Sequence, residues 1–245
     1  MLLETRQVVK MFSGFKAVNA MSITINQGEI LGLIGPNGAG KSTFFNCLTG
    51  DTLPSSGEVF LNGQDITRLV PEARAKLGLA RSFQVPLTFE NMSVLENVMV
   101  GAFIHTTHTA SAREKARQVI ARVGLTEQIN APARSLGTPG RKRLEIARAL
   151  ATEPKILLLD EAMAGLTPTE VQEAITLVRD IHSQGITLVI VEHIMEVIMS
   201  LTHRVIVMHQ GAQIAAGTPA EVTRDPQVVS AYLGKRAAKA AAGQS

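Results

Sequence analysis

Residues 35–43 combine glycines, a lysine and two hydroxyl side chains in a pattern that suits phosphate chemistry. The segment reads Gly-Pro-Asn-Gly-Ala-Gly-Lys-Ser-Thr and directly follows the apolar run Ile30–Ile34. Its glycines allow positive φ angles, so that successive backbone N–H groups point at anionic oxygens. Lys41 would neutralise the terminal phosphates, and Ser42 would offer a hydroxyl to Mg²⁺ where a helix begins. The pattern predicts a bound nucleoside triphosphate with Mg²⁺, although a plain glycine turn between strand and helix is the alternative.

We assign nucleotide contacts to every position of this loop. The positions are Gly35, Pro36, Asn37, Gly38, Ala39, Gly40, Lys41, Ser42 and Thr43.

Two adjacent carboxylates end a second apolar run. Asp160 and Glu161 follow residues 156–159, which are Ile-Leu-Leu-Leu. Neighbouring strand residues point to opposite sides, so each carboxylate can take its own role at the edge of an open α/β sheet where ligands bind. We expect Asp160 to hold Mg²⁺ and Glu161 to orient or deprotonate an attacking water. A pair of solvated carboxylates at a strand end is the alternative.

A histidine ends the next apolar run. His193 follows Ile190-Val191-Glu192, and its neutral imidazole is able to donate a hydrogen bond to a γ-phosphate. A lone strand-end histidine is usually structural, and only its place in this series of strand ends favours a role at the nucleotide.

Composition excludes several classes of protein. With 245 residues, of which 45% are hydrophobic, the chain is able to bury a large core. Its longest apolar runs are far shorter than the roughly 20 residues that cross a bilayer, and the first residues do not resemble a secretory signal. The net charge of +3 is dispersed, so we expect no nucleic-acid partner. Residues 141–143 are the one compact basic cluster, interpreted as a solvated helix start, and Cys47 is expected to be a small core residue.

The order of elements indicates an α/β protein. Apolar runs at 156–159, 186–191 and 204–208 alternate with helical patterns near 169–183 and 193–200, which is typical of a covered, largely parallel sheet. Shorter strands are expected earlier, at 6–10, 22–25, 30–34 and 57–61, with one more leading to Phe83. Residues from about 90 to 152 have helical periodicity instead.

Four landmarks in order make the chain resemble the ATP-binding-cassette (ABC) family along nearly its whole length. They are the phosphate loop, the segment Ser82-Phe83-Gln84, the strand ending at Glu161, and His193. The resemblance implies that Gln84 contacts Mg²⁺ and the attacking water, and that it couples the site to a helical lobe. It thus assigns catalytic roles to Gln84, Glu161 and His193, and the metal to Ser42, Gln84 and Asp160.

The resemblance also implies a fold: a P-loop NTPase with a RecA-like, mainly parallel sheet, an antiparallel β subdomain and an inserted helical subdomain. We expect one ABC ATPase domain over 1–234 and a flexible tail over 235–245. Within the domain, the expected parts are the core with its β subdomain at 1–89 and 153–218, the helical subdomain at 90–152, and C-terminal helices at 219–234.

The family stacks adenine on an aromatic residue just before its second strand. Phe12 fits that place, and Phe15 is the competing candidate. A simple core aromatic is the alternative for either, because stacking contributes only about 1–3 kcal/mol and leaves little pattern in a sequence.

The family's signature loop is altered in this chain. Family members have Leu-Ser-Gly-Gly-Gln before a helix ending in Ile-Ala-Arg-Ala-Leu, and the helix ending is intact at 146–150. Ungapped counting aligns the signature with Leu136, Gly137, Thr138, Pro139 and Gly140. Gly137 then replaces the serine, and Pro139 lacks an N–H donor. A shift of one residue would instead bring in Ser135 or let Thr138 act for the serine.

Other segments resemble one branch of the family, the ATPase subunits of branched-chain amino acid importers. They are Arg81–Gln84, 92–97, 217–222, 225–226 and 231–234, and Thr167 in place of a usual aspartate also occurs in this branch. The branch also serves urea, amides and aromatic acids, and a close cousin extracts lipopolysaccharide. The solute is chosen by other chains.

The resemblance implies a peripheral subunit on the cytoplasmic face of the cell membrane that binds ATP and Mg²⁺. Its partners would be a second ATPase subunit, in a homodimer or heterodimer, two membrane permeases and, indirectly, a periplasmic solute-binding protein. Phe83, Leu87, Phe89 and Met92 are expected either to line the groove for a permease helix or to pack in the local core. The rival functions are a soluble, non-transport ABC ATPase and a nucleotide-binding regulator that does not hydrolyse ATP.

Overall fold

The computed structural model describes residues 1–232, and the tail expected at 235–245 lies outside them, as do the last two residues of the expected segment 219–234. The chain divides into two compact units. Unit 1 consists of residues 1–70 and 189–245, and unit 2 of residues 71–188. The helical lobe expected at 90–152 falls wholly within unit 2.

Unit 1 begins with an antiparallel sheet around the long strand β1 (Leu3–Phe12). This strand pairs with β2 (Phe15–Met21), β3 (Thr24–Ile25) and β5 (Ser56–Leu61), and β5 pairs in turn with β6 (Gln64–Asp65). The strand expected at 22–25 is therefore wrong in its bounds, because the chain forms a tight hairpin with β1 first and only two residues of that range pair.

A second group of strands in unit 1 carries the phosphate loop. Strand β4 (Ile30–Ile34) is buried at every position and runs parallel to β10 (Arg204–His209), which pairs antiparallel with β11 (Ala212–Gly217). Helix α1 (Lys41–Thr49) follows β4 and buries Cys47, as expected from the sequence.

The rest of unit 1 covers this strand group. Helix α7 (Met195–Leu201) follows β9 (Thr187–Val191), and helix α8 (Pro219–Val222) follows β11. Residues 226–232 are also helical. One apolar cluster joins these elements, comprising Ile34, Ile198, Val205, Val207, Val222 and Val228. Because β4 and β10 are apolar on successive residues, their side chains have to be covered on both faces.

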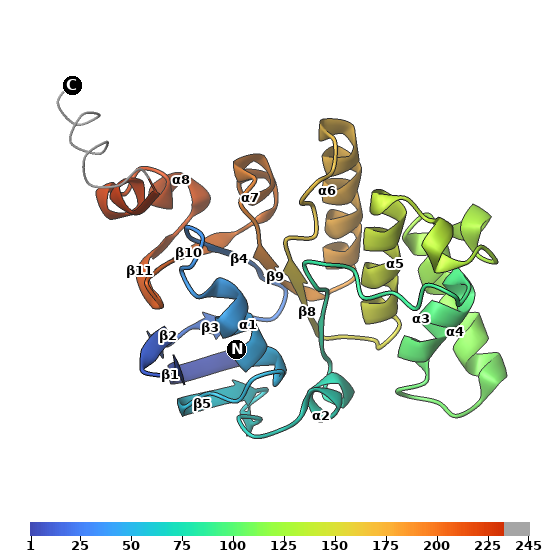
Figure 1. Ribbon diagram of the computed structural model, residues 1–245, viewed down its shortest axis with the longest axis horizontal. Helices are drawn as coiled ribbons and strands as arrows, with labels where there is room; N and C mark the ends of the chain where they lie inside the picture. The colour runs from blue at the N-terminus through green and yellow to red at the C-terminus, as the bar shows by residue number, and fades with distance from the viewer. Residues whose placement is uncertain (233–245) are drawn as a thin grey trace. The chain divides into compact units, whose positions relative to one another are not determined.

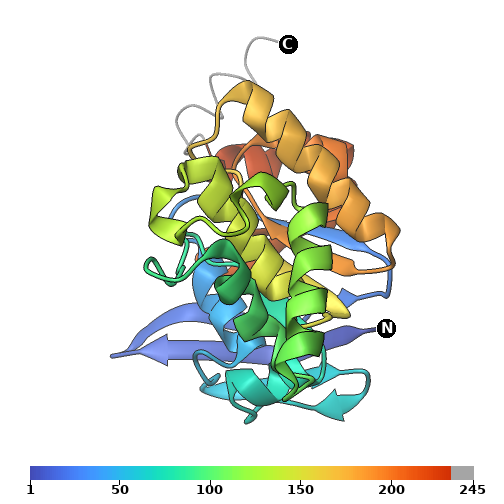
Figure 2. The ribbon, with the colours of Figure 1, turned by 90° about the vertical axis from the view of Figure 1, so that its right-hand side faces the viewer.

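Unit 2 pairs two parallel strands and adds a set of helices. Strand β7 (Leu79–Arg81) follows helix α2 (Pro71–Lys76) and pairs with β8 (Ile156–Asp160), which is buried throughout. Helices α3 (Val94–Ala102), α4 (Thr109–Arg122) and α5 (Thr138–Leu150) pack against one another (Figure 2).

Two short 3₁₀ helices, Thr126–Gln128 and Ala133–Ser135, connect α4 to α5. Helix α6 (Pro168–Ser183) then leads to β9 (Thr187–Val191), a fully buried strand at the boundary of the two units in the sequence (Figure 1). The helical pattern expected between 90 and 152 and the strands expected near 156, 186 and 204 are confirmed.

Candidate functional site

The phosphate loop joins β4 to α1 in unit 1, as the sequence predicts. Gly38 and Gly40 have φ angles of +79° and +98°, and Gly40 is the residue before the first turn of α1. No side chain caps this helix start, so the first backbone N–H groups of α1 remain available to an anion at the positive end of the helix dipole. The described backbone therefore has the form of an anion-binding loop.

Two loop glycines are required by close contact with the neighbouring chain. A Cβ atom at Gly35 would lie 2.2 Å from the carbonyl oxygen of Met208, and one at Gly40 would lie 2.1 Å from that of Ala17. Since both contacts are with backbone, no rotamer change relieves them. These glycines hold the loop against β2 and β10, and a bulkier residue would displace it.

Lys41 folds back over its own loop. Its Nζ donates hydrogen bonds to the carbonyl oxygens of Gly35 at 2.7 Å and of Pro36 at 3.2 Å, and the side chain is buried. The exposed residues of the segment are Asn37, Gly38 and Ser42, at the tip of the loop and the start of α1. The ammonium group is thus held beside the backbone that would surround a polyphosphate.

Phe12 and Phe15 face each other across the β1–β2 hairpin. They are 48% and 65% exposed, and the ammonium of Lys10 lies 5.0 Å from the centre of the Phe12 ring. Neither ring belongs to the core, so the core interpretation of these aromatics is wrong. Both rings are accessible to a stacked base.

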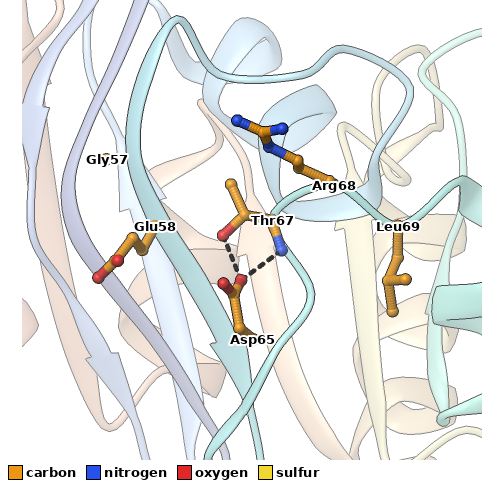
Figure 3. A pocket seen from close by; sticks show the side chains of 6 residues that line it. All are labelled: Gly57, Glu58, Asp65, Thr67, Arg68 and Leu69. Atoms are coloured by element: carbon orange, nitrogen blue, oxygen red, sulfur yellow. Dashed lines mark hydrogen bonds between the residues drawn. The ribbon is translucent and has the colours of Figure 1, made fainter.

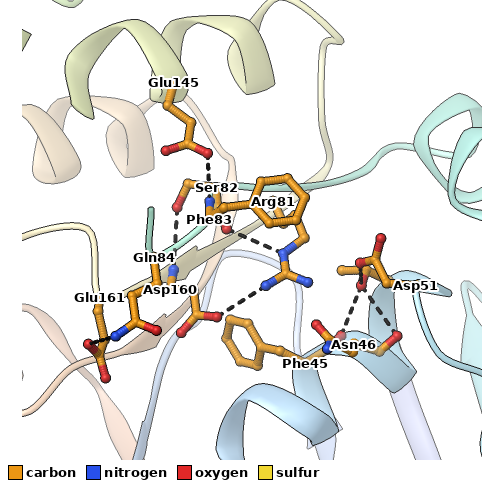
Figure 4. A network of polar contacts seen from close by, with 11 residues as sticks. Phe45, Asn46, Asp51, Arg81, Ser82, Phe83, Gln84, Glu145, Asp160 and Glu161 are labelled. Atoms are coloured by element: carbon orange, nitrogen blue, oxygen red, sulfur yellow. Dashed lines mark hydrogen bonds and ion pairs between the residues drawn. The ribbon is translucent and has the colours of Figure 1, made fainter. Parts of the chain in front are cut away.

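Gln84 and Glu161 come together in unit 2. The side-chain amide of Gln84 donates a hydrogen bond of 2.6 Å to Oε2 of Glu161, as Figure 4 shows. Gln84 lies three residues after β7, and Glu161 follows the last residue of β8. The parallel pairing of these strands brings their carboxyl ends side by side, which explains the contact across 77 positions of sequence.

Glu161 has an unusual backbone. Its φ angle is +47°, in the left-handed region that a non-glycine residue avoids unless its surroundings fix it. Its carbonyl oxygen accepts hydrogen bonds from Nζ of Lys142 at 3.0 Å and from the amide of Ala164 at 3.1 Å. Such strain is typical of functional positions, and here two donors hold it in place.

Asp160 makes an ion pair that the sequence did not predict. The guanidinium of Arg81 lies 3.1 Å from its Oδ2, and the Ser82 hydroxyl accepts a hydrogen bond of 3.3 Å from its backbone amide (Figure 4). Arg81 also stacks on the Phe83 ring at 4.3 Å. Both side chains of the pair are buried, and a carboxylate supplies the kind of oxygen donor that Mg²⁺ uses.

His193 belongs to unit 1 and lies two residues after the end of β9. Its side chain is exposed, whereas Glu192 before it is buried. The imidazole is therefore accessible to a ligand.

The altered signature lies at the start of α5. Gly137 takes the N-cap position, Thr138 is the first helical residue, and Pro139 lies in the first turn, where a helix has no internal acceptor for its N–H. Ser135 belongs to a 3₁₀ helix, and its hydroxyl donates to the carbonyl of Pro132 at 2.7 Å. In the ungapped register Gly137 is the cap residue, and its replacement of the signature serine stays a prediction, as does the shifted register with Ser135 or Thr138.

Thr167 is the N-cap of α6. Its backbone amide donates to Oε2 of Glu170 at 2.8 Å, and its hydroxyl accepts from the amide of Glu170 at 3.4 Å. This is a reciprocal capping box. The backbone hydrogen bond from Thr167 lowers the pKa of Glu170 below its ordinary value. The threonine thus fills the capping role for which an aspartate is equally suited.

Sequence reasoning missed the role of α5 and misjudged the basic cluster at its start. Lys142 is buried and bonded to Glu161, so the interpretation of residues 141–143 as a solvated helix start is wrong for this residue. Glu145 is also buried and binds the amide of Phe83. The one available signal was a row of charged residues spaced by three, at 142, 145 and 148, of which the last two lie among apolar residues of the helix.

A separate surface pocket of about 370 Å³ lies in unit 1 (Figure 3). Its polar contacts are local, because the backbone amide of Thr67 donates to Oδ1 of Asp65 at 2.8 Å and the hydroxyl of Thr67 donates to the same atom at 2.5 Å. It holds none of the residues expected to bind nucleotide, since its lining consists of Gly57, Glu58, Asp65, Thr67, Arg68 and Leu69.

The described geometry defines a P-loop nucleotide-binding protein of the α/β class. A glycine-rich loop joins a buried parallel strand to a helix, and the carboxyl end of another buried parallel strand carries two acidic residues. Among residues 1–232, no helix is both long and apolar enough to traverse a bilayer.

Comparisons with known proteins narrow this class. The family model described as ABC transporter matches residues 18–164, and one described as branched-chain amino acid ATP-binding cassette transporter matches residues 212–238. The high-affinity branched-chain amino acid transport ATP-binding protein LivG of Escherichia coli is 37% identical, over 96% of this chain and 98% of that protein. The lipopolysaccharide export system ATP-binding protein LptB of Acidithiobacillus ferridurans is 35% identical, over 95% of this chain and 97% of that protein.

Solved structures agree with these similarities. One described as the ADP conformation of an ATP-binding cassette of an ABC transporter has a TM-score of 0.86 and 32% identity, and the match covers 96% of this chain and 99% of that chain. The chain belongs to the ABC transporter family as an ATP-binding cassette. It is a nucleotide-binding ATPase subunit of a transporter.

Proposed function

We propose that this chain powers a bacterial importer of branched-chain amino acids or related small polar or aromatic solutes, through separate membrane subunits. The observation that carries the ATPase mechanism is the 2.6 Å hydrogen bond between Gln84 and Glu161. It joins a residue expected to sense the nucleotide to the residue expected to activate water. The choice of solute rests on the similarity to LivG and on the match at residues 212–238.

Glu161 is the proposed general base, and Gln84 positions it together with the attacking water. A carboxylate that accepts one hydrogen bond from an amide keeps its second oxygen for a water molecule. His193 is proposed to donate a hydrogen bond to the γ-phosphate, and Lys41 to neutralise the β- and γ-phosphates.

Mg²⁺ is the proposed metal, held by Ser42, Gln84 and Asp160 with the phosphates and water. All three side chains offer oxygen donors, and Mg²⁺ commonly binds one or two carboxylates while keeping several waters. The ion would neutralise developing charge on the transferred phosphoryl group. The buried carboxylate of Asp160, paired with Arg81, supports this assignment.

The proposed transporter contains a second ATPase subunit. The signature of one cassette grips the γ-phosphate bound to the other, and in the ungapped register this chain has Gly137, at the cap of α5, in place of the signature serine. The phosphate loop of this chain retains every expected residue. We therefore propose a heterodimer in which the partner supplies an intact signature and this chain supplies the stronger hydrolytic site.

The proposed docking surface for the permease lies after Gln84. Leu87 and Phe89 are 58% and 45% exposed, so neither packs in the core, whereas Phe83 and Met92 are partly buried. An exposed apolar segment beside the catalytic glutamine suits a short helix from a membrane subunit. The complex would place this chain on the cytoplasmic face of the membrane, with a periplasmic binding protein delivering the solute.

The test is Glu161→Gln in the assembled transporter with its second ATPase subunit. The variant should bind MgATP, stop hydrolysis and stop uptake of labelled leucine into proteoliposomes. Unchanged turnover would remove Glu161 from the catalytic role. Parallel assays of urea uptake and of lipopolysaccharide extraction test the solute class independently of the ATPase mechanism. Full activity of this chain purified alone would contradict the heterodimer.

A further inference from the structure

Helix α5 carries a row of three charged side chains, each three positions from the next. They are Lys142, Glu145 and Arg148, and this spacing places them along one side of the helix. Lys142 and Glu145 are buried, and Glu145 is only 5% exposed. Burying charged groups costs free energy unless they are paired and hydrogen-bonded, so their partners indicate what the row does.

Glu145 binds the backbone directly before Gln84. Its Oε1 accepts a hydrogen bond of 2.8 Å from the amide of Phe83, shown in Figure 4. A single buried side chain therefore fixes one end of the segment that carries Gln84.

Arg148 holds the far end of the same segment. Its Nη1 donates to the carbonyl oxygen of Leu87, and its guanidinium lies 4.7 Å from the centre of the Phe89 ring. The carbonyl of Leu87 is thus held by α5, as the amide of Phe83 is. The segment from Phe83 to Phe89 is therefore attached to one face of α5.

Lys142 holds the other half of the catalytic contact. Its Nζ donates to the backbone carbonyl of Glu161, the residue with the left-handed φ angle. Lys142 and Glu145 are one turn apart on a rigid helix. The same helix consequently holds the backbone of Glu161 and the backbone beside Gln84, whose side chains meet at 2.6 Å.

We infer that Glu145 and Lys142 are positioning residues that set the Gln84–Glu161 contact from α5. The inference rests on the proposed function, in which Gln84 and Glu161 act in hydrolysis. Neither positioning residue touches the reacting atoms. Gly137 is the N-cap of α5, so the signature segment lies at the start of this helix. Movement of that end of the helix would shift both Gln84 and Glu161, the two halves of the catalytic contact, together.

The first test measures the backbone and does not depend on activity. In the full-length chain, Glu145→Ala should raise hydrogen–deuterium exchange at the amide of Phe83, because its acceptor is lost. Glu145→Gln, which keeps one acceptor oxygen, should raise it less. Glu29→Ala is the matched control, because Glu29 is also buried and accepts from the backbone amide of Asn26 at 2.9 Å in unit 1. Exchange at Phe83 that matches wild type in Glu145→Ala would overturn the inference.

The second test measures coupling to catalysis in the assembled transporter. Glu145→Ala should lower kcat by about 10- to 100-fold with little change in KM, because a displacement of about 1 Å is that costly to catalysis. In a Gln84→Ala background it should lower kcat by no more than about twofold, because both changes remove the same contact. If the kcat losses of Glu145→Ala and Gln84→Ala multiply fully in the double variant, Glu145 has a merely structural role. Lys142→Met should behave as Glu145→Ala does, and it provides a second variant if the alanine variant fails to fold.

The two proposals fail in different ways. If Glu161→Gln leaves turnover unchanged, the proposed function fails, and the exchange measurement still decides whether α5 holds the Gln84 segment. If Glu161→Gln stops turnover while the effects of Glu145→Ala and Gln84→Ala multiply, the inference about α5 fails alone.

Discussion

The guanidinium of Arg81 lies 3.1 Å from the carboxylate of Asp160, and both side chains are almost fully withdrawn from water. Asp160 ends β8, and Arg81 ends the parallel strand β7. A buried carboxylate is stabilised when an opposite charge lies beside it, and carboxylate oxygens are ligands that Mg²⁺ uses. The pair therefore gives the buried Asp160 side chain an ionic partner within unit 2.

Removing Arg81 should destabilise the protein strongly. Arg81→Ala leaves the Asp160 charge buried without its guanidinium, and the free energy of unfolding should fall by about 3–5 kcal/mol. Glu173→Gln is the comparison, since it removes the partner of Arg143 at the surface and should cost less than about 1 kcal/mol. Urea unfolding of each variant measures both values. Equal losses in the two variants would contradict a special role for the buried pair.

The stability of the protein should depend on pH through Glu145. Burial is the largest influence and raises the pKa of Glu145 from 4.5 to about 7, although the amides of Phe83 and Leu87 act in the opposite direction. The folded protein therefore binds this proton more tightly than the unfolded chain does. The resulting stabilisation is complete below pH 4.5 and is lost as the pH rises through about 7. Its size is at most about 3 kcal/mol.

Glu145→Gln should remove this pH dependence. Urea unfolding between pH 5 and pH 8 gives the free energy of unfolding of wild type and of Glu145→Gln. The value for wild type minus the value for the variant should decline as the pH rises. Glu170→Gln is the control, because the pKa of Glu170 is lowered by the Thr167 amide. Its contribution is present above the ordinary pKa and is lost only in more acidic solution, so it should add no slope between pH 5 and pH 8. If the free energy of unfolding of Glu145→Gln declines with pH as that of wild type does, other groups cause the decline.

The glycines of the phosphate loop should differ in their tolerance of a side chain. Gly40→Ala places a methyl group against the carbonyl of Ala17, so the loop should shift, MgATP affinity should fall more than tenfold and the melting temperature should fall. At Gly38 nothing lies within 4 Å, and only the positive φ angle opposes alanine. Gly38→Ala should therefore cost about 1–2 kcal/mol without unfolding the loop. A fluorescent ATP analogue and thermal melting together distinguish the two variants, and equal behaviour would refute the steric argument.

The cap of α6 should accept an aspartate. Thr167→Ala removes the acceptor for the amide of Glu170 and should cost about 1 kcal/mol, whereas Thr167→Asp should be close to wild type. Thr176→Ala lies on the same helix away from the cap and should change stability by less than about 0.5 kcal/mol. Chemical unfolding of the three variants is the measurement. An aspartate variant as unstable as the alanine variant would contradict the capping role.

Several features were predictable because their signal is local in the chain. The strand Ile30–Ile34 and the glycines after it specify the phosphate loop within a few residues, and the apolar run before Asp160 specifies a buried strand with acidic residues at its end. Features that depend on pairing between separate segments were not predicted as well, and the bounds of one strand were wrong. The expected strand at 22–25 was misplaced because the β1–β2 hairpin depends on pairing between two segments.

The sequence by itself determined the class of protein, because the phosphate loop and the strand before Asp160 are short segments whose residues carry the whole pattern. The roles of Gln84, Asp160 and Glu161 at the nucleotide stay predictions, and that of Gln84 rests on the family resemblance. Only the tertiary structure decided that Arg81 pairs with Asp160 and that α5 buries Lys142 and Glu145 against the Gln84 segment. A charged residue on a helix gives the same sequence pattern whether it faces water or a backbone amide far away in the chain. Its partner is set by the pairing of β7 with β8 and by the packing of α5, which no local pattern contains.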